Sequence, residues 1–423
     1  MLDKEMINKK KIKNVLYFAE NAISSIQGGG IVVYSVLKGL PPEKLLGFFE
    51  YRNITPAPEY AERFVYLGQP RFPKLLKAFK QNSFISRLFK VLFIDYLVKK
   101  DFNFVLKQTK EQNFMPEIIY FSGLSLRYLK LAIKAASYFN VPMVILHMDD
   151  WLEREASEMG IFAKIWHKIS VKNMKIAAGK SLASTTNSPG LSEKITNLTG
   201  YEHKPANNCN FDLLKSEFSP IQIITNNQIP VIAYAGALNS KLQGETLEVI
   251  ASAVAELNSE DFKVHLYIYT PWQFAPRANL ISVPDAVFYK GHISREKLAD
   301  VYLNSDFLLT TVTFNPVNLL LFKNSLSTKL SEYLCVGKPV ISAGHPDWHL
   351  NNYVKENNCG FSILMDENYK RAQIKHQIKQ IITTPKEELR QIGINNRNLW
   401  EKAHDVRIMS KDTRLAIGLD EIK

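Results

Sequence analysis

The chain has 423 residues, of which 46% are hydrophobic, 22% charged and 11% aromatic. At about 150 residues per domain this length predicts two or three domains, and the composition excludes disordered and collagen-like chains. The net charge is +12, from 53 basic and 41 acidic residues, which indicates an anionic partner: nucleic acid, anionic lipid or a phosphorylated ligand. Three cysteines without CxxC spacing argue against a zinc site and a secreted disulfide framework: Cys209, Cys335 and Cys359.

The first half of the chain alternates short apolar runs with longer helical patterns, which is typical of a parallel α/β sheet. Strands are predicted at residues 15–19, 118–121, 141–146 and 182–186. Helices are predicted at residues 31–40, 124–139, 164–178 and 188–199. The loop Gly28-Gly29-Gly30 precedes the first helix. There the backbone approaches a phosphate closely or simply makes a tight turn, and both interpretations stay open.

A second α/β series follows a stretch rich in Asn, Pro and Ser at 205–230, which predicts a domain boundary. Its predicted strands are 231–235, 264–269, 287–290, 307–311 and 339–342, and its predicted helices are 245–257, 294–305, 327–336, 369–383 and 386–404. Two similar halves of this kind predict an α/β fold of two Rossmann-like domains facing a cleft. Ligands are expected beyond the carboxyl ends of the strands.

The length of the apolar runs, at the N-terminus and elsewhere, indicates where in the cell the protein is expected. The apolar run at 15–19 is five residues long, which is too short for a secretory signal peptide. No stretch reaches the roughly 18–20 apolar residues of a membrane-spanning helix. These features lead us to expect a cytoplasmic protein.

The positive charge is concentrated at residues 71–110, which hold ten Lys or Arg against Asp95 and Asp101, a net charge of +8. Phenylalanines and leucines are interleaved at helical spacing, which predicts a basic amphipathic helix able to lie on an anionic membrane surface. The alternative is a solvated helix face over a core-facing stripe. Nucleic-acid binding is disfavoured, because zinc-finger spacing and an RNA-binding aromatic signature are both missing.

Two apparent motifs are weak evidence for a phosphate or metal site. The run 178–181 resembles the end of a phosphate-binding loop, but that loop requires glycine at position 174, which is Met174. Asp149 and Asp150 suggest a metal pair, yet adjacent side chains at a strand end point apart and no third ligand is evident. Local hydrogen bonding or capping is the favoured interpretation, and no metal site is predicted.

The most informative stretch is residues 325–342. Ser327 or Thr328 is placed to cap a helix whose N-terminus would bind phosphate. Glu332 lies on the next turn, where its two oxygens can accept hydrogen bonds from the two hydroxyls of a ribose. Gly337 ends the helix, and Lys338 begins the approach to the next strand. The pattern predicts an anion site with a carboxylate one turn inside the helix.

At this point the sequence resembles a known family. Residues 329–341 (KLSEYLCVGKPVI) resemble the nucleotide-sugar segment of GT-B glycosyltransferases of family 4, also called glycosyltransferase group 1. Residues 288–309 and 234–238 resemble further elements of its C-terminal domain. Residues 141–151 resemble the acceptor-domain strand that ends in an active-site histidine. The resemblance spans nearly the whole chain, and the segment around Glu332 is its specific part.

The resemblance implies an architecture and an activity. Residues 1–215 would form an acceptor-binding domain and residues 216–400 a nucleotide-sugar-binding domain, with a C-terminal helix at 401–423 crossing back to the N-terminal domain. The activity would be retaining transfer of a sugar from a UDP-, GDP- or dTDP-sugar to a lipid-linked or polysaccharide acceptor. It would need no metal or other cofactor and would take place at the inner face of the plasma membrane.

The resemblance also implies roles for residues of the second half. Glu332 would bind the donor ribose, and Ser327 and Thr328 would meet the diphosphate at the helix N-terminus. Lys241, five residues after Gly236, would bind a phosphate. The backbone of three consecutive residues would meet the base: Gly291, His292 and Ile293.

In the first half, Gly29 and Gly30 would approach the diphosphate. His147 would lie near the transferred sugar and is, with Glu332, the predicted catalytic residue. Asp149 and Asp150 would contact the acceptor.

Two positions depart from the family pattern. Asn324 stands where the family's E-x7-E motif has its first, sugar-facing glutamate, and Ala237 stands where an arginine often follows Gly236. The change at Asn324 bears on donor choice and on activity itself. It therefore keeps open a second hypothesis, a non-catalytic GT-B-like subunit that binds a partner transferase or a membrane. A sugar-nucleotide epimerase of GT-B fold is a third hypothesis.

Overall fold

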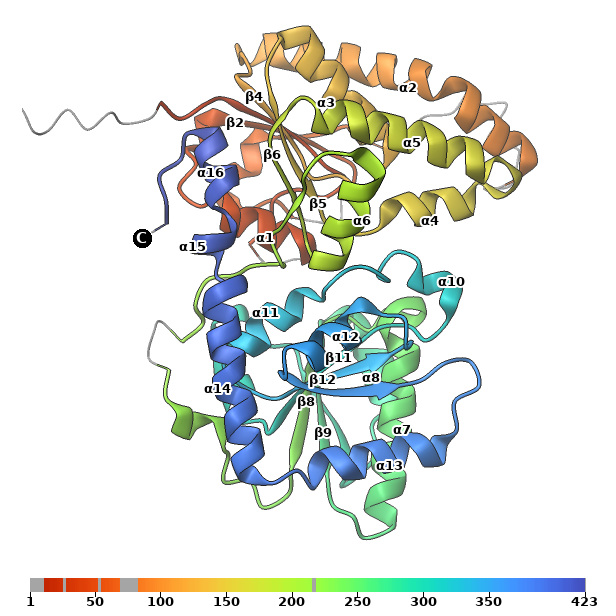
Figure 1. Ribbon diagram of the computed structural model, residues 1–423, viewed down its shortest axis with the longest axis vertical. Helices are drawn as coiled ribbons and strands as arrows, with labels where there is room; N and C mark the ends of the chain where they lie inside the picture. Colours follow the sequence, from red (N-terminus) through yellow and green to blue (C-terminus); the bar gives the residue numbers. More distant parts are fainter. Residues whose placement is uncertain (1–10, 26–27, 52–54, 69–82, 215–217, 423) are drawn as a thin grey trace, which may run out of the picture. The chain divides into compact units, whose positions relative to one another are not determined.

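The structure is a computed structural model that describes residues 11–25, 28–51, 55–68, 83–214 and 218–422. It divides into two compact units. Unit 1 comprises Met1–Cys209 and Val406–Lys423, and unit 2 comprises Asn210–Asp405. Each unit is an α/β layer structure built on one parallel sheet (Figure 1). The predicted α/β fold of two Rossmann-like domains is confirmed at this level.

Among the described residues, unit 1 contains a seven-stranded sheet with strand order β3-β2-β1-β4-β5-β6-β7. The strands are β1 (Val15–Phe18), β2 (Leu45–Phe49), β3 (Phe64–Tyr66), β4 (Ile118–Phe121), β5 (Met143–His147), β6 (Ser181–Thr186) and β7 (Lys204–Pro205). Strands β1, β2, β4 and β5 are buried along their whole length. Helices cover both faces of a parallel sheet, which is why such central strands are apolar throughout.

The helices of unit 1 begin at serine caps in three cases. Ser83, Ser125 and Ser188 each accept a hydrogen bond from the N–H three residues later, which satisfies a donor that the helix leaves unpaired. The helices are α1 (Gly28–Val36), α2 (Phe84–Glu111), α3 (Leu126–Phe139), α4 (Trp151–Glu158), α5 (Ala163–Ala178), α6 (Pro189–Thr199), α15 (Val406–Met409) and α16 (Lys411–Ile417). None of the helices in the described part of the chain is long and apolar enough to cross a membrane.

The last two helices belong to unit 1, although they follow unit 2 in the sequence. The Arg414 guanidinium donates to the carbonyl oxygens of Val36 (2.9 Å) and Lys38 (2.8 Å), at the end of α1. The Lys13 N–H donates to the Ile417 carbonyl oxygen at 2.9 Å. The expected return of the C-terminal segment to the N-terminal unit is therefore observed.

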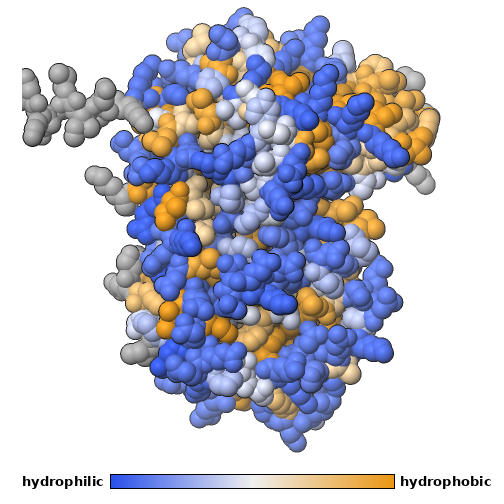
Figure 2. Space-filling view, in the orientation of Figure 1, coloured by the Kyte–Doolittle hydropathy of each residue, from blue (hydrophilic) through white to orange (hydrophobic). Residues whose placement is uncertain are grey.

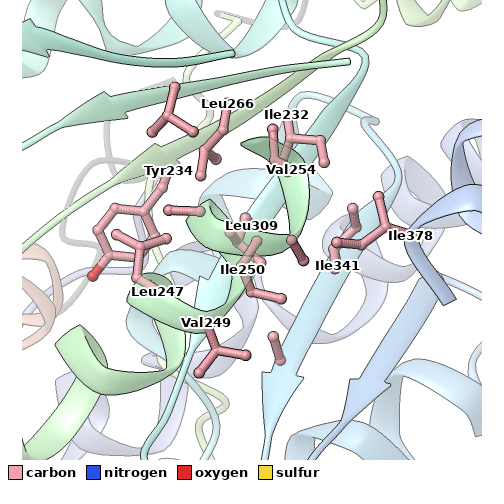
Figure 3. Packing of buried hydrophobic residues seen from close by; sticks show 14 of the residues in the cluster. Ile232, Tyr234, Leu247, Val249, Ile250, Val254, Leu266, Leu309, Ile341 and Ile378 are labelled. Atoms are coloured by element: carbon pink, nitrogen blue, oxygen red, sulfur yellow. The ribbon is translucent and has the colours of Figure 1, made fainter. Parts of the chain in front are cut away.

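Unit 2 contains, among the described residues, a six-stranded parallel sheet with order β10-β9-β8-β11-β12-β13. The strands are β8 (Val231–Ala235), β9 (His265–Tyr269), β10 (Val287–Gly291), β11 (Phe307–Thr311), β12 (Val340–Gly344) and β13 (Gly360–Leu364). Figure 3 shows one face of this sheet, where Ile232, Leu309 and Ile341 pack against helix residues such as Ile250 and Ile378. Burial of these aliphatic side chains is the main favourable term in forming the unit.

Two sets of helices cover this sheet. The helices are α7 (Glu245–Ser259), α8 (Ala275–Leu280), α9 (Leu298–Leu303), α10 (Pro316–Leu319), α11 (Thr328–Cys335), α12 (His349–Glu356), α13 (Arg371–Ile382) and α14 (Lys386–Ala403). Helices α7 and α13 pack together over the face shown in Figure 3. Helices α11 and α14 pack together within the second core, where Trp400 of α14 is fully buried.

The unit boundaries lie at 209/210 and 405/406, whereas the sequence predicted 215/216 and 400/401. At the first boundary, the Asp212 carboxylate pairs with the Arg397 guanidinium of α14 at 2.5 Å, which ties residues before 215 to unit 2. At the second, His404 is buried and its Nε2 lies 2.9 Å from the Tyr353 hydroxyl of α12. Such long-range pairs leave no signal in local composition.

Several elements differ from the sequence prediction. Strands β2, β3, β7 and β13 were not predicted, and of these β3 and β7 are edge strands of only three and two residues. The glycines at 28–30 are not a loop but the first turn of α1. The predicted helix 294–305 is a 3₁₀ turn, Arg295–Lys297, followed by α9. Of the basic segment 71–110, residues 71–82 lie outside the described residues, and the remainder lies in Ser83 and α2.

Candidate functional site

The carboxyl edge of the unit 2 sheet gathers polar and glycine-rich strand ends. Gly236 follows β8, and its N–H donates to the Tyr269 carbonyl oxygen at the end of β9 (2.9 Å). The Thr270 N–H in turn donates to the Gly291 carbonyl oxygen at the end of β10 (3.1 Å). Three neighbouring strand ends are therefore held side by side. This edge is where open α/β sheets bind their ligands.

Helix α11 begins at this edge. Ser327 is its N-cap and accepts a hydrogen bond from the Lys329 N–H at 3.3 Å. The Thr310 hydroxyl of β11 donates to Ser327 Oγ at 3.0 Å, so the strand positions the cap. Thr328, the first helical residue, is exposed. Because the first N–H groups of a helix lack intrahelical partners, this end has a positive partial charge that attracts an anion.

Glu332 lies one turn inside α11, and its side chain is 13% exposed. Arg295 donates to Glu332 Oε1 at 3.2 Å, and the buried Tyr302 hydroxyl donates to Oε2 at 3.0 Å. Both partners come from the segment after β10. A carboxylate has about four acceptor positions, so these two bonds leave capacity for two further hydroxyl donors. Burial, followed by the negative charge of Glu332, raises the pKa of Tyr302 well above its ordinary value, so its hydroxyl keeps its proton and remains a donor.

Lys329 is a cation at the same edge that the sequence analysis did not assign. Its Nζ lies 5.0 Å from the centre of the Tyr234 ring of β8. A Cβ placed on Gly236 would be 2.7 Å from the same Nζ, so the ammonium lies directly against the Gly236 backbone. Burial lowers the pKa of the Lys329 ammonium to about 8, and Glu332 opposes that fall. No hydrogen bond or ion pair of this ammonium is found within the described residues.

The predicted phosphate and base contacts lie around the same strand ends. Lys241 is exposed in the π-helical turn Ser240–Gly244 after β8, where its N–H donates to Asn239 Oδ1 at 3.1 Å. Gly291 has a φ of +88°. His292 is exposed and Ile293 half-buried. These residues lead into the turn that holds Arg295, so the Arg295–Glu332 pair joins the predicted base segment to α11.

The predicted glycines of unit 1 are tightly packed in the first turn of α1. A Cβ on Gly29 would be 2.9 Å from Met148 Sδ, after β5. A Cβ on Gly30 would be 2.8 Å from the Ala22 carbonyl oxygen. Gly30 therefore needs to be glycine for packing, because its contact is with backbone, whereas the Met148 side chain could move away from a Cβ on Gly29.

His147 ends β5 and is 1% exposed. Its ring centre is 5.5 Å from that of His203, and its buried Nδ1 has no hydrogen-bond partner among the described residues. Burial, and then the neighbouring His203, lowers the pKa of His147 well below its ordinary value, so the ring is neutral. The His147 side chain is therefore a neutral ring that the protein encloses almost completely.

Asp149 and Asp150 follow at the same strand end. The Asn187 side-chain amide donates to Asp149 Oδ1 at 3.2 Å. Asp150 is almost fully buried and pairs with the Lys194 ammonium of α6 at 2.7 Å. The described residues contain no group of three or more His, Cys, Asp or Glu side chains placed to hold a metal.

The carboxyl edge of the unit 1 sheet holds a second charged group that the sequence analysis missed. Glu20, after β1, is buried and accepts hydrogen bonds from the Leu124 N–H (2.5 Å) and the Ser125 hydroxyl. Glu155 of α4 accepts a hydrogen bond from the Leu126 N–H at 3.1 Å. Both carboxyl groups therefore lie at the N-terminus of α3, where the helix dipole favours negative charge.

Glu155 predicts a pH dependence of stability. Burial raises its pKa to about 7, above the roughly 4.3 of an unfolded glutamate. The folded chain therefore binds more protons between these values, and its stability falls as the pH rises through them. Relative to wild type, we expect Glu155→Gln to gain roughly 1–2 kcal/mol in free energy of unfolding between about pH 5 and pH 8. Urea unfolding at each pH measures this.

The matched control is Glu158→Gln, an exposed glutamate on the same helix. It should keep the wild-type pH profile. A wild-type profile in Glu155→Gln itself would contradict the assignment of the raised pKa.

Comparison with known proteins finds neither a matching family model nor a matching curated protein. Solved structures do match. HepE from Anabaena, in complex with UDP, is 14% identical with a TM-score of 0.61, covering 96% of this chain and 99% of HepE. Trehalose-6-phosphate synthase from Burkholderia multivorans is 10% identical with a TM-score of 0.58, covering 96% and 98%. The lipopolysaccharide outer core galactosyltransferase WaaB is 15% identical with a TM-score of 0.53, covering 95% and 99%.

The chain has the GT-B fold. In this GT-B chain, the structure brings Ser327, Thr328 and Glu332 to one end of α11, as the local pattern predicted. It adds Arg295, Tyr302 and Lys329, which sequence reasoning missed. The spacing of Lys329 and Glu332, three residues apart on one helix, was the available signal for the lysine. Arg295 and Tyr302 meet Glu332 only through the folding of the chain.

Proposed function

We propose that this protein is a glycosyltransferase that takes a nucleoside diphosphate sugar as its donor and binds the nucleotide in unit 2. The observation that carries the proposal is the position of Glu332, a partly buried carboxylate one turn inside a helix whose N-terminus lies at the carboxyl edge of the sheet. A helix N-terminus suits a diphosphate, and a carboxylate suits the ribose hydroxyls. HepE, a GT-B structure solved with UDP and with UDP-glucose, supports a UDP-sugar as the first donor to test.

In this proposal, different residues bind the ribose, the diphosphate and the base of the donor. Glu332 accepts hydrogen bonds from the ribose. Ser327 and Thr328 meet the diphosphate through the α11 N-terminus, and Lys329 and Lys241 supply positive charge. The backbone of Gly291, His292 and Ile293 meets the base.

The reaction follows from this charge distribution. Transfer forms a bond between the sugar's anomeric carbon and an acceptor hydroxyl oxygen and breaks the bond to the diphosphate oxygen. Negative charge develops on the leaving diphosphate, which can take up the proton that the acceptor hydroxyl loses. Preorganised cations and N–H donors aimed at that charge lower the barrier. We propose that the lysines and the helix N-terminus do this without a metal ion, and that the configuration is retained, as in family 4.

For the acceptor we propose a lipid-linked or polysaccharide substrate at the inner face of the plasma membrane. The proposed contributions of unit 1 are Gly29 and Gly30 near the diphosphate, His147 near the sugar, and Asp149 and Asp150 at the acceptor.

A thermal-shift screen tests the donor proposal. A ligand that binds only the folded state adds RT ln(1 + [L]/Kd), about 2.7 kcal/mol at 100 Kd. We expect one of the UDP-, GDP-, dTDP- or CDP-sugars to raise the melting temperature, and the free sugar at the same concentration to leave it unchanged. If no nucleotide shifts the melting temperature, unit 2 does not bind a nucleotide and the proposal fails.

The second candidate function is a non-catalytic subunit that retains the GT-B fold, and Asn324 favours it because the sugar-facing glutamate is missing. Nucleotide release from the donor that binds best separates the two. An active enzyme cleaves it with acceptor present, whereas a non-catalytic subunit binds without turnover. Asn324→Glu would then raise turnover only in the non-catalytic case.

A further inference from the structure

One end of unit 1 exposes large apolar side chains. It is formed by the first turn of α2, the 3₁₀ turn Gly160–Phe162 and the first turn of α5, and the Phe84 ring packs on Phe162 with 5.4 Å between ring centres. Figure 2 shows hydrophobic residues gathered where these segments meet. Four side chains between 43% and 76% exposed define this apolar end: Phe84, Ile85, Ile161 and Ile165.

The outer face of α2 continues this surface. Leu92 and Tyr96 are 64% and 62% exposed. Beyond them, Lys99 and Lys100 are exposed on the same helix. The exposed face of α2 thus changes along its length from apolar to basic.

Helix α5 carries a basic stripe that starts at the apolar end. Four exposed lysines recur at positions i, i+4, i+8 and i+11, which places them on one face of the helix. They define the α5 lysine stripe: Lys164, Lys168, Lys172 and Lys175. The helix contains no acidic residue, and within the described residues none of these lysines forms an ion pair. No described residue therefore neutralises their charge through an ion pair.

The apolar end and the α5 lysine stripe together suit a partner that has both apolar and negatively charged groups. Adjacent exposed aliphatic side chains mark an interaction surface. A lipid bilayer with anionic headgroups offers hydrocarbon to the isoleucines and negative charge to the lysines, whose long stems keep the ammonium groups at headgroup level. Nucleic acid would engage the lysines but offers nothing to Ile161 and Ile165.

We propose that the apolar end and the α5 lysine stripe together dock unit 1 on an anionic lipid bilayer. The basic segment 71–110 predicted a membrane surface on α2, and the present surface adds α5, where the sequence analysis placed no function. The inference adds a membrane-binding surface to the proposed function. It rests on that function only for the purpose of docking, which is to bring the enzyme to a lipid-linked acceptor. Its test uses no donor, so the two proposals fail separately.

Co-sedimentation of the full-length protein with vesicles tests the docking. We expect binding to phosphatidylcholine vesicles containing about 30% phosphatidylglycerol, and at least tenfold weaker binding to phosphatidylcholine alone. Raising the salt from about 0.05 to 0.5 M should weaken the first by tenfold or more, because salt screens the lysine–headgroup attraction. The proposal would be overturned if the protein did not bind the anionic vesicles, or if its binding did not change with the salt concentration.

Two variants locate the surface. Replacing the four stripe lysines by glutamine should reduce binding to anionic vesicles to the level seen with phosphatidylcholine alone. The double variant Ile161→Ser/Ile165→Ser should weaken binding about tenfold while keeping its salt dependence.

Unit 2 supplies matched controls for both. Replacing four exposed, unpaired lysines by glutamine changes the net charge equally: Lys355, Lys370, Lys386 and Lys402. Trp272→Ser/Leu280→Ser removes two side chains that are 77% and 80% exposed. If the control variants lose as much binding as the unit 1 variants, the surface is assigned wrongly. The melting temperature of each variant, measured without any ligand, reports independently that it is folded.

Discussion

Glu332→Gln is expected to remove most of the preference of this protein for a ribonucleotide over its 2′-deoxy analogue. In wild type, the Glu332 carboxylate is fixed by Arg295 and Tyr302 and has two acceptor positions left. Hydrogen bonds to a charged group contribute about 1.5–3 kcal/mol each, which corresponds to about 10–100-fold in affinity. Titration calorimetry with UDP and 2′-deoxy-UDP should therefore give a wild-type ratio of at least about tenfold, and a ratio near one in the variant.

The ratio separates ligand binding from a purely structural ion pair. If Glu332 serves only to hold Arg295, the variant will be less stable, but it will keep the wild-type ratio. That result would contradict the ribose assignment. Tyr302→Phe is the matched control, because it removes one bond to the carboxylate and leaves both oxygens in place. It should retain most of the discrimination.

Lys329→Gln is expected to weaken UDP binding by about 10–100-fold and to leave uridine binding unchanged. The ammonium lies against Gly236 at the carboxyl edge of the sheet, and no described carboxylate pairs with it. A partly buried cation facing a diphosphate is screened less than an exposed one, so its loss costs more. Calorimetry with UDP and uridine measures both effects.

The exposed Lys241 is the matched control. Lys241→Gln should weaken UDP binding about two- to fivefold, because solvent and salt screen an exposed cation. If Lys241→Gln has the larger effect and Lys329→Gln has none, the cation predicted from the sequence is the correct one and the assignment of Lys329 is wrong.

The pKa of Lys329 gives this prediction a second readout. Burial lowers the pKa to about 8, with Glu332 opposing the fall. The ammonium form is therefore present below about pH 8 and is lost above it. UDP affinity in wild type should decline as the pH rises from about 7.5 to 9.5, and Lys329→Gln should lack this decline.

Much of the fold could be predicted from local patterns. Strands buried on both faces, such as β4 and β5, form apolar runs between helical segments, and that alternation indicates a parallel sheet. Strand β13 was not predicted, although β10, the other edge strand of the same sheet, was. Helix ends were predicted where a serine cap or a left-handed glycine marks them, as at Ser188 and Gly200.

The residues of the candidate site also fall into those that local sequence predicts and those that it does not. Ser327, Thr328 and Glu332 could be found because a cap and the next helical turn lie within six residues of sequence. Arg295 and Tyr302 could not, because 37 and 30 residues separate them from Glu332. Only the packing of the turn after β10 against α11 brings them to the carboxylate.

The sequence by itself determined the α/β class of the two units and the capped start of α11 with Glu332 one turn inside it, because hydrophobic period and capping depend on neighbours within a few residues. The tertiary structure decided which charges are neutralised. Lys194 is paired with Asp150, whereas Lys329 lies over the Tyr234 ring without an ion pair among the described residues, and composition cannot distinguish them. The net charge of +12 likewise says nothing of where the basic residues lie. The folded chain shows four α5 lysines without an ion pair among the described residues, beside the apolar end that α2 and α5 form. Pairing and exposure are properties of the folded chain, since they depend on residues far apart in sequence.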